Sequence, residues 1–179
     1  MNNFLGNSSH TSHTRRITFL GLMLAVILVL LEVERMLPPL PLFPPNFKLG
    51  LSNIMVMFAI FFVGVKDAFT LGVLKAGFNF LLRGYMGFAL SLSGGMASIA
   101  LIALFRRLFK QKISLLSLSI IGALAHNVAQ LATASVLLSS PNLFRWYLPV
   151  LIVAGVFMGS VTGMAANHIL PILKRIYQK

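Results

Sequence analysis

Three polar residues recur at intervals of four within an otherwise apolar stretch, and together they could bind an anion. They are Lys75, Asn79 and Arg83. Residues four apart lie on the same face of an α-helix, so two cations and an amide would follow one side of it. Cationic groups donate charge-assisted hydrogen bonds to carboxylates and phosphates. The spacing therefore predicts a helix face that can hold such a group of a ligand.

Other polar residues interrupt the remaining apolar stretches in the same way. A charge at the centre of a bilayer costs about 2.5–3.5 kcal/mol on insertion scales, so it requires a partner or a role. These residues supply an acid, a base, amides, an imidazole and aromatic rings: Glu34, Lys48, Asn53, His126, Asn127, Gln130, Trp146 and Tyr147. On the helices expected below, they all fall in the outer half of the membrane. We therefore expect one outward-facing polar pocket that binds a small molecule.

Structural interpretations stay open beside this one. Glu34 could form an ion pair with a basic residue at position 75 or 83, and the polar residues of 126–130 could form hydrogen bonds between helices. Trp146 and Tyr147 are of the type that collects where a membrane meets water. Each interpretation explains its own residues, but none explains why all of them share one depth.

The elements that would position these residues are transmembrane helices. Of 179 residues, 58% are hydrophobic and 10% are charged, and the mean hydropathy is +0.89. Soluble domains carry about 45–50% apolar and about 25% charged residues, so this composition excludes a soluble domain and a disordered chain. Six apolar stretches are evident, at residues 17–31, 49–65, 68–82, 88–105, 113–138 and 147–170. They predict an all-α integral membrane protein with six transmembrane helices.

The basic residues set the expected orientation. With the N-terminus inside, ten of the 15 Lys and Arg residues fall in inner segments and four in outer segments, with Lys75 inside a span. Cytoplasmic segments are enriched in Lys and Arg, so both termini are expected inside a bacterial plasma membrane. The positive charge thus reflects topology and anionic lipid rather than nucleic acid. We expect a mobile polar tail at 1–15, the membrane domain at 16–173 and a basic cytoplasmic C-terminus at 174–179.

A proline-rich segment separates the first two stretches. Residues 38–47, PPLPLFPPNF, contain five prolines and cannot lie inside a helix. We expect a stiff apolar loop on the outer side, which would roof the pocket.

Small residues indicate where helices approach one another. Gly155, Gly159 and Gly163 lie four apart on the last stretch, and Gly21 and Ala25 lie four apart on the first. Because lipid is as apolar as leucine, close helix packing in a membrane depends on such residues. Packing within this chain would explain both sets. Alternatively, the face formed by Gly21 and Ala25 docks a second membrane subunit.

The sequence provides little chemistry for catalysis. It contains no cysteine and no G-x-x-x-x-G-K-[ST] phosphate loop, and Asp67 is its one aspartate. Thiolate chemistry, ATP hydrolysis by that loop and carboxylate clusters for Mg²⁺-diphosphate are therefore excluded. We expect a non-enzymatic protein without a metal or a resident cofactor, in which ATP-driven transport would need other subunits.

Several segments resemble the Gx transporter family. Residues 47–54, FKLGLSNI, resemble its V-K-L-G-L-A-N-I motif, and residues 34–38, ERMLP, resemble E-S-L-I-P. Residues 91–96 resemble S-L-A-G-G, residues 122–130 resemble G-A-x-x-H-N-x-x-Q, and residues 147–149 open the last helix as in that family. The resemblance spans roughly residues 17–172. A departure is Lys75, where the family would have arginine, so the charge is kept without the bidentate geometry.

The resemblance implies a fold more than a ligand. Gx transporter proteins are similar to the substrate-binding S components of energy-coupling-factor (ECF) transporters, with six helices, an outer ligand site and a lid from the first outer loop. S components dock on a transmembrane T component through small residues of the first helix, here Gly21 and Ala25, and two ATPase subunits complete the transporter. Some members are labelled heptaprenyl diphosphate synthase component I, and others accompany flavin- and quinone-linked extracellular electron transfer. Uptake with an ECF module is therefore the first expectation, and the other two roles are its alternatives.

Overall fold

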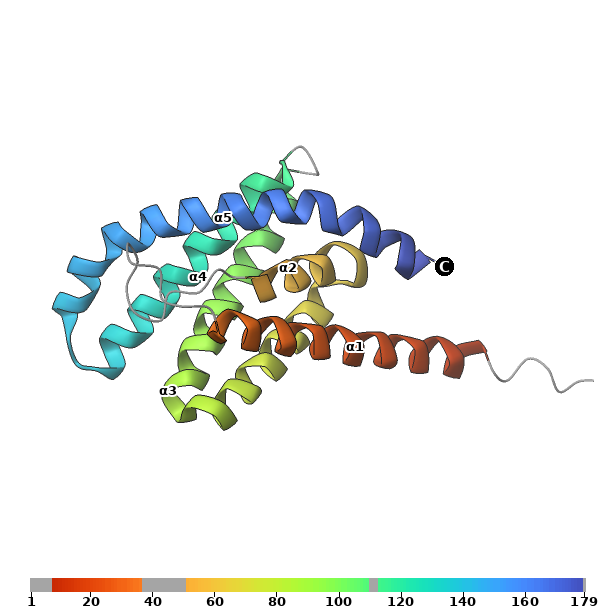
Figure 1. The fold of residues 1–179 in the computed structure, drawn as a ribbon, viewed down its shortest axis with the longest axis horizontal. Coiled ribbons are helices and arrows are strands. Elements are labelled where there is room, and N and C mark those ends of the chain that lie inside the picture. The colour runs from red at the N-terminus through yellow and green to blue at the C-terminus, as the bar shows by residue number, and fades with distance from the viewer. Residues whose placement is uncertain (1–7, 37–50, 110–112, 179) are drawn as a thin grey trace, which may run out of the picture.

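The computed structural model describes residues 8–36, 51–109 and 113–178, and Figure 1 shows their arrangement. These residues form α-helices and one π-helical segment: α1 (Ser8–Met36), α2 (Leu51–Phe58), η1 (Ala59–Val63), α3 (Val65–Leu108), α4 (Leu115–Leu137) and α5 (Pro141–Gln178). The described part of the chain contains no strand. The predicted all-α class is confirmed.

The third and fourth predicted stretches form the two arms of one helix, α3, which reverses direction at Gly84. This residue has φ 66° and ψ −161°, a conformation open essentially to glycine. The first arm (residues 65–83) and the second arm (residues 85–108) then lie side by side in Figure 1. Asn79 Nδ2 donates across the two arms to Ser91 Oγ at 3.1 Å. The sequence predicts a break here, because the apolar stretches 68–82 and 88–105 end and begin on either side of Arg83 and Gly84.

Replacing Gly84 with alanine is expected to destabilise the protein by about 1–3 kcal/mol, because a Cβ atom disfavours its backbone conformation. Equilibrium unfolding of the detergent-solubilised protein measures the change. Gly77→Ala is the matched control, because Gly77 is inside a regular arm of α3 and a Cβ there meets no atom of the described residues within 4 Å. An unchanged stability of Gly84→Ala would show that the reversal does not depend on this glycine.

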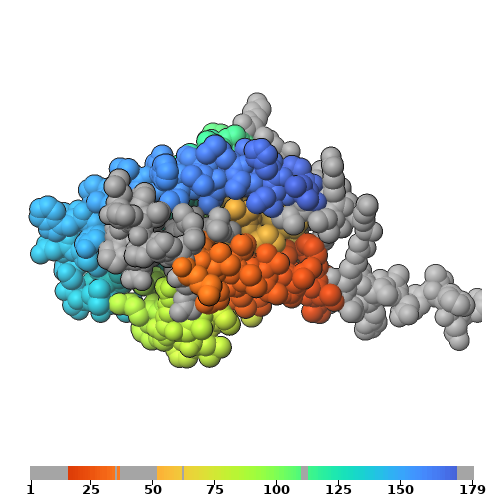
Figure 2. All heavy atoms as spheres, viewed as in Figure 1, coloured from red at the N-terminus to blue at the C-terminus, as the bar shows by residue number. Residues whose placement is uncertain are grey.

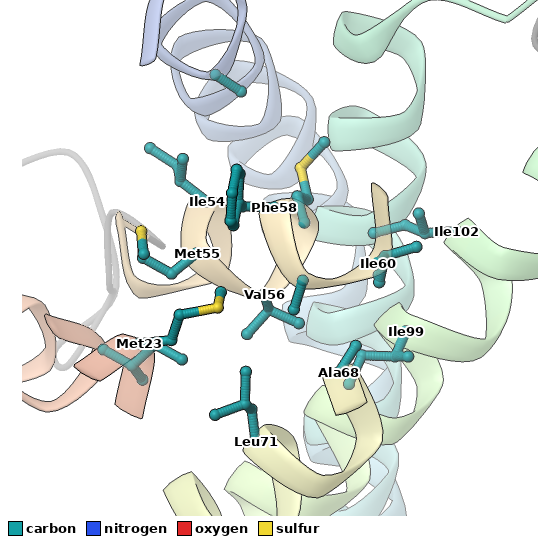
Figure 3. Packing of buried hydrophobic residues seen from close by; sticks show 14 of the residues in the cluster. Met23, Ile54, Met55, Val56, Phe58, Ile60, Ala68, Leu71, Ile99 and Ile102 are labelled. Carbon is teal, nitrogen blue, oxygen red and sulfur yellow. The ribbon is translucent and has the colours of Figure 1, made fainter. Parts of the chain in front are cut away.

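The second predicted stretch, residues 49–65, forms the centre of the core instead of a full crossing. Figure 3 shows side chains of α2 and η1, Phe58 and Ile60 among them, surrounded by Met23 of α1 and Ile99 of α3. At 1.5 Å per residue, α2 and η1 together extend about 20 Å, less than the roughly 30 Å of a bilayer core. Gly64 ends the segment with φ 143°, and its N–H donates to Ala59 O at 2.8 Å.

Helix length and composition identify a multi-pass membrane protein. Among the described residues, four helices are long and apolar enough to cross a membrane: Arg16–Glu34, Val65–Leu108, Leu115–Leu137 and Pro141–Ile172. This number is lower than the six predicted crossings. The two arms of α3 are counted as one helix, and the apolar helix Ser52–Phe61 is too short to be counted.

Basic side chains hold one end of the bundle together, and we call it the basic end. Arg16 of α1 forms a 2.6 Å ion pair with the buried carboxylate of Asp67, at the start of α3. Arg106, near the end of α3, donates to Ile60 O at 2.5 Å and lies 4.6 Å from the centre of the Phe61 ring. These contacts bring the N-terminal half of α1, the α2–α3 junction and the end of α3 together.

Glycines of α5 allow it to pack tightly on α4. A Cβ built at Gly159 would lie 2.7 Å from Ile120 Cα, and one built at Gly163 would lie 2.9 Å from Leu116 Cα. Packing within the chain is confirmed for these glycines. Gly21 and Ala25 differ from them, because both are exposed and a Cβ at Gly21 meets none of the described atoms within 4 Å. Figure 2 shows α1 at the molecular surface, with one side uncovered by the other coloured elements.

The terminal helices are longer than predicted. α1 begins at Ser8, inside the expected tail, because no proline or glycine interrupts residues 8–15. α5 begins at Pro141, since proline is favoured in the first helical turn, and it continues to Gln178. The implication that residues 147–149 open the last helix is therefore wrong, and Pro149 lies inside α5. The expected roof, residues 38–47, lies outside the described residues.

Candidate ligand-binding site

A cavity of about 330 Å³ lies within the helical bundle. Its lining comes from α1, α2, both arms of α3, α4 and α5. This volume is at the lower end of the roughly 300–1,000 Å³ typical of small-molecule sites. The cavity therefore has the size that a small ligand needs.

At one end of the cavity, Lys75 is the centre of a polar network. Its ammonium donates to Ser52 Oγ at 2.8 Å and to Asn53 Oδ1 at 3.1 Å, both on α2. The backbone N–H of Ser52 donates to Glu34 Oε1 at 3.3 Å. Glu34 and Lys75 are both buried, and the negative charge of Glu34 acts on the ammonium. A buried charge needs such partners, so this network fixes the position of the Lys75 cation.

The three polar residues that recur every four positions on α3, Lys75, Asn79 and Arg83, all line the cavity. Asn79 is 1% exposed, and its Nδ2 donates to Lys75 O and to Ser91 Oγ, each at 3.1 Å. Arg83 follows one turn later, where its side chain lines the cavity and is exposed. We call this region, with Lys75, Asn79 and Arg83, the polar end of the cavity.

Polar side chains of α4 reach the cavity between its neighbouring helices. Asn127 Nδ2 donates to Leu151 O of α5 at 3.1 Å, and Gln130 Nε2 donates to Leu90 O of α3 at 3.2 Å. These two bonds fit the structural interpretation, in which the amides join helices. The His126 ring packs on Gly94, where an added Cβ would lie 2.9 Å from Nδ1. All three side chains also line the cavity.

The structure brings together nine of the eleven residues that the sequence singled out. The lining includes Glu34, Asn53, Lys75, Asn79, Arg83, His126, Asn127, Gln130 and Tyr147. Lys48 lies outside the described residues. Their contact with a ligand stays a prediction, since the cavity shows only that they share one space.

Trp146 is not part of this lining. It is 76% exposed, whereas its neighbour Tyr147 lines the cavity. The cavity side of α5 follows a four-residue repeat through Leu143, Tyr147 and Leu151, and Trp146 is turned about 100° away from it. Its exposure fits the alternative interpretation, an aromatic residue of the membrane interface.

The other end of the cavity has a different chemistry. Among the described residues that line this end, none has a charged side chain. They are Ser98, Ile99, Ile102, Ser119, Gly122, Ala123, Met158 and Thr162. Neither these residues nor Ser52 and Ser91 of the polar end could be predicted as site residues from the sequence. Serine and threonine are common in transmembrane helices, so their presence alone gives no signal of a site.

We find no combination of side chains that suggests a metal. Within the described ranges, no three His, Asp or Glu residues lie close enough together to hold a metal ion. The chemistry that the cavity offers is hydrogen bonding and charge at one end, and apolar contact with hydroxyl groups at the other.

Comparison with known proteins gives the family. A family model described as heptaprenyl diphosphate synthase component I matches residues 23–169 of the 179. No curated protein and no solved structure matches the chain. Heptaprenyl diphosphate synthase component I is another label of Gx transporter proteins, the family that the sequence motifs resemble. The family resemblance is therefore confirmed. Because the match covers most of the chain, this protein belongs to the heptaprenyl diphosphate synthase component I family.

Proposed function

We propose that this protein binds a small anionic molecule in its cavity and takes it up from the outer side of a bacterial plasma membrane. The observation that carries the proposal is the polar end, where Lys75, Asn79 and Arg83 line one cavity and Lys75 donates to Ser52 and Asn53. An ammonium has three hydrogen-bond donors, and within the described residues Lys75 uses two, so a third is available for a ligand. A carboxylate or phosphate fits this donor set.

The proposed topology has six crossings, with α3 crossing twice. Its arms of about 19 and 24 residues extend about 28 and 36 Å, which suits a bilayer core of about 30 Å. The arms run antiparallel, so both ends of α3 lie on the side of the basic end. Since cytoplasmic segments are rich in Lys and Arg, the basic end would face the cytoplasm and the polar end the outside. The short α2 with η1 would be the remaining crossing, through the protein core, and shorter than the bilayer core.

Cysteine labelling in intact cells is expected to give this orientation, because the natural sequence contains no cysteine. Asn142→Cys, exposed at the α4–α5 turn, should react with a membrane-impermeant maleimide from outside. Lys66→Cys, exposed at the basic end, should react only after permeabilisation. The reverse pattern would put the polar end in the cytoplasm and contradict uptake from outside.

Energy for uptake would come from partner subunits of the ECF type. The sequence has no phosphate loop, so we propose a binding protein rather than an enzyme. The exposed Gly21 and Ala25 leave a shallow strip on α1 that a transmembrane T component could pack against. Two ATPase subunits would complete the complex.

Mass spectrometry of purified protein tests the binding function. We expect a small molecule that co-purifies with the natural protein and is lost in Arg83→Ala. Arg107→Ala is the matched control, because Arg107 is exposed at the basic end and does not line the cavity. The same set of compounds in all three samples would contradict the proposal.

A second candidate is an accessory role in flavin- or quinone-linked electron transfer, or in heptaprenyl diphosphate synthesis. The uncharged end of the cavity supports it, since its lining suits the apolar part of such molecules. The family description supports the synthase role in particular. The same mass spectrometry separates these roles by identifying a quinone, a flavin or a prenyl diphosphate. Loss of electron export or of heptaprenyl diphosphate on deletion, with vitamin uptake intact, would favour the second candidate.

A further inference from the structure

A pair of hydroxyl groups lies at the end of the cavity opposite to the cations. Ser119 of α4 and Thr162 of α5 are both buried, both line the cavity, and their oxygens are 2.8 Å apart. At 1.5 Å per residue, Ser119 is about 16 Å along α4 from Gln130, which donates to Leu90 O beside Ser91 at the polar end. A molecule whose anionic group lies at the polar end would therefore place its far end near this pair.

The hydrogen bonds of Thr162 fix the direction of the bond between the two hydroxyls. Thr162 Oγ1 lies 2.8 Å from Met158 O and 3.2 Å from Gly159 O, and both carbonyls can only accept. A hydroxyl has one proton, so Thr162 gives its proton to the backbone and must accept from Ser119. The Ser119 proton is then used as well. Among the described residues no donor is bonded to Ser119 Oγ, which leaves it as an acceptor at the cavity wall.

We infer that Ser119, oriented by Thr162, forms a second subsite that accepts a hydrogen bond from the far end of the bound molecule. The inference rests on the proposed function and extends it to a substrate class. This class is an amphipathic anion with a hydroxyl or N–H donor at the end opposite its anionic group. The middle of such a molecule would contact Ile99, Ile102 and Met158.

Three synthetic amphiphiles test the inference on the full chain in lipid nanodiscs. They are octyl phosphate, 8-hydroxyoctyl phosphate and 8-methoxyoctyl phosphate, and empty nanodiscs in equilibrium dialysis correct for partition into lipid. The hydroxyl compound can donate at its far end, whereas the ether can only accept. We expect the hydroxyl to improve the Kd by about 3- to 10-fold over octyl phosphate, and the ether to give no improvement.

Two variants then assign the effect to the hydroxyl pair. Ser119→Ala should bring the Kd of the hydroxyl compound to that of octyl phosphate, both measured in the same variant. Thr162→Val should free the Ser119 proton, so that the ether gains affinity and approaches the alcohol. Ser135→Ala is the matched control, because Ser135 is buried on the same helix but does not line the cavity.

The outcomes separate this inference from the proposed function. If octyl phosphate binds and Lys75→Met weakens it, but the hydroxyl gives no advantage, the subsite is overturned and the proposed function stands. A hydroxyl advantage that persists in Ser119→Ala also overturns the subsite. If none of the three compounds binds above empty nanodiscs, both the subsite and the anion-binding function are overturned.

Discussion

Replacing Lys75 with methionine is expected to weaken the binding of octyl phosphate by about 10- to 150-fold. A hydrogen bond to a charged group contributes about 1.5–3 kcal/mol, and each 1.4 kcal/mol is about tenfold in Kd. The effect should be large because Ser52 and Asn53 hold the ammonium at the cavity wall, so little freedom is lost when an anion binds. Methionine has a similar length and no charge. Equilibrium dialysis in nanodiscs measures the change.

The folded state needs its own control, because methionine removes a cation that acts on the buried carboxylate of Glu34. Removing one of two interacting buried charges is destabilising, so Lys75→Met is expected to lower stability as well as binding. The double variant Glu34→Gln with Lys75→Met removes both charges and should fold normally, yet still not bind.

Two further variants complete this test. Lys66→Met makes the same change at an exposed position of the basic end and should bind normally. Lys75→Arg introduces the arginine that the family resemblance leads us to expect at this position. It keeps the positive charge and should retain most of the binding. If the double variant folds and binds octyl phosphate as tightly as the natural protein, Lys75 has no part in the anion site.

The gathering of polar residues could be predicted because spacing and depth are properties of sequence. A four-residue repeat fixes a helix face, and the distance from a helix end fixes the depth. Lys75, Asn79 and Arg83 therefore lie along one cavity as the repeat predicts, and His126 of α4 lines the same cavity. The reversal at Gly84 was also visible, since a basic residue and a glycine end the apolar stretch.

Other features depend on tertiary contacts that no local pattern encodes. The stretch 49–65 is as apolar as a crossing, but α2 is surrounded by protein, and an apolar segment alone does not distinguish the two. Trp146 and Tyr147 are adjacent in sequence, and their different positions follow from the rotation of α5. Ser119 gave no signal, because its role depends on Thr162, which lies 43 residues further along the chain.

Replacing Gly159 with leucine is expected to destabilise the protein by about 3 kcal/mol, near the upper limit of typical overpacking. Its Cβ would lie 2.7 Å from Ile120 Cα and 3.2 Å from Ala123 Cβ. The nearest neighbour is backbone, so no side-chain rotation can relieve the contact and α5 must move away from α4. Separation of these helices also opens the cavity between them. Equilibrium unfolding in mixed micelles measures the loss, and octyl phosphate binding should fall with it.

The same substitution at Gly21 separates packing inside the chain from packing against a partner. A Cβ at Gly21 meets none of the described atoms within 4 Å, so Gly21→Leu should leave stability and octyl phosphate binding unchanged. Close helix approach in a membrane depends on small residues, so the leucine would obstruct a T component docked on this face of α1. We therefore expect Gly21→Leu to lose co-purification with that component and to abolish uptake. Uptake at the natural rate in this variant would show that the partner docks on another surface. A loss of stability would show that this face of α1 packs within the chain.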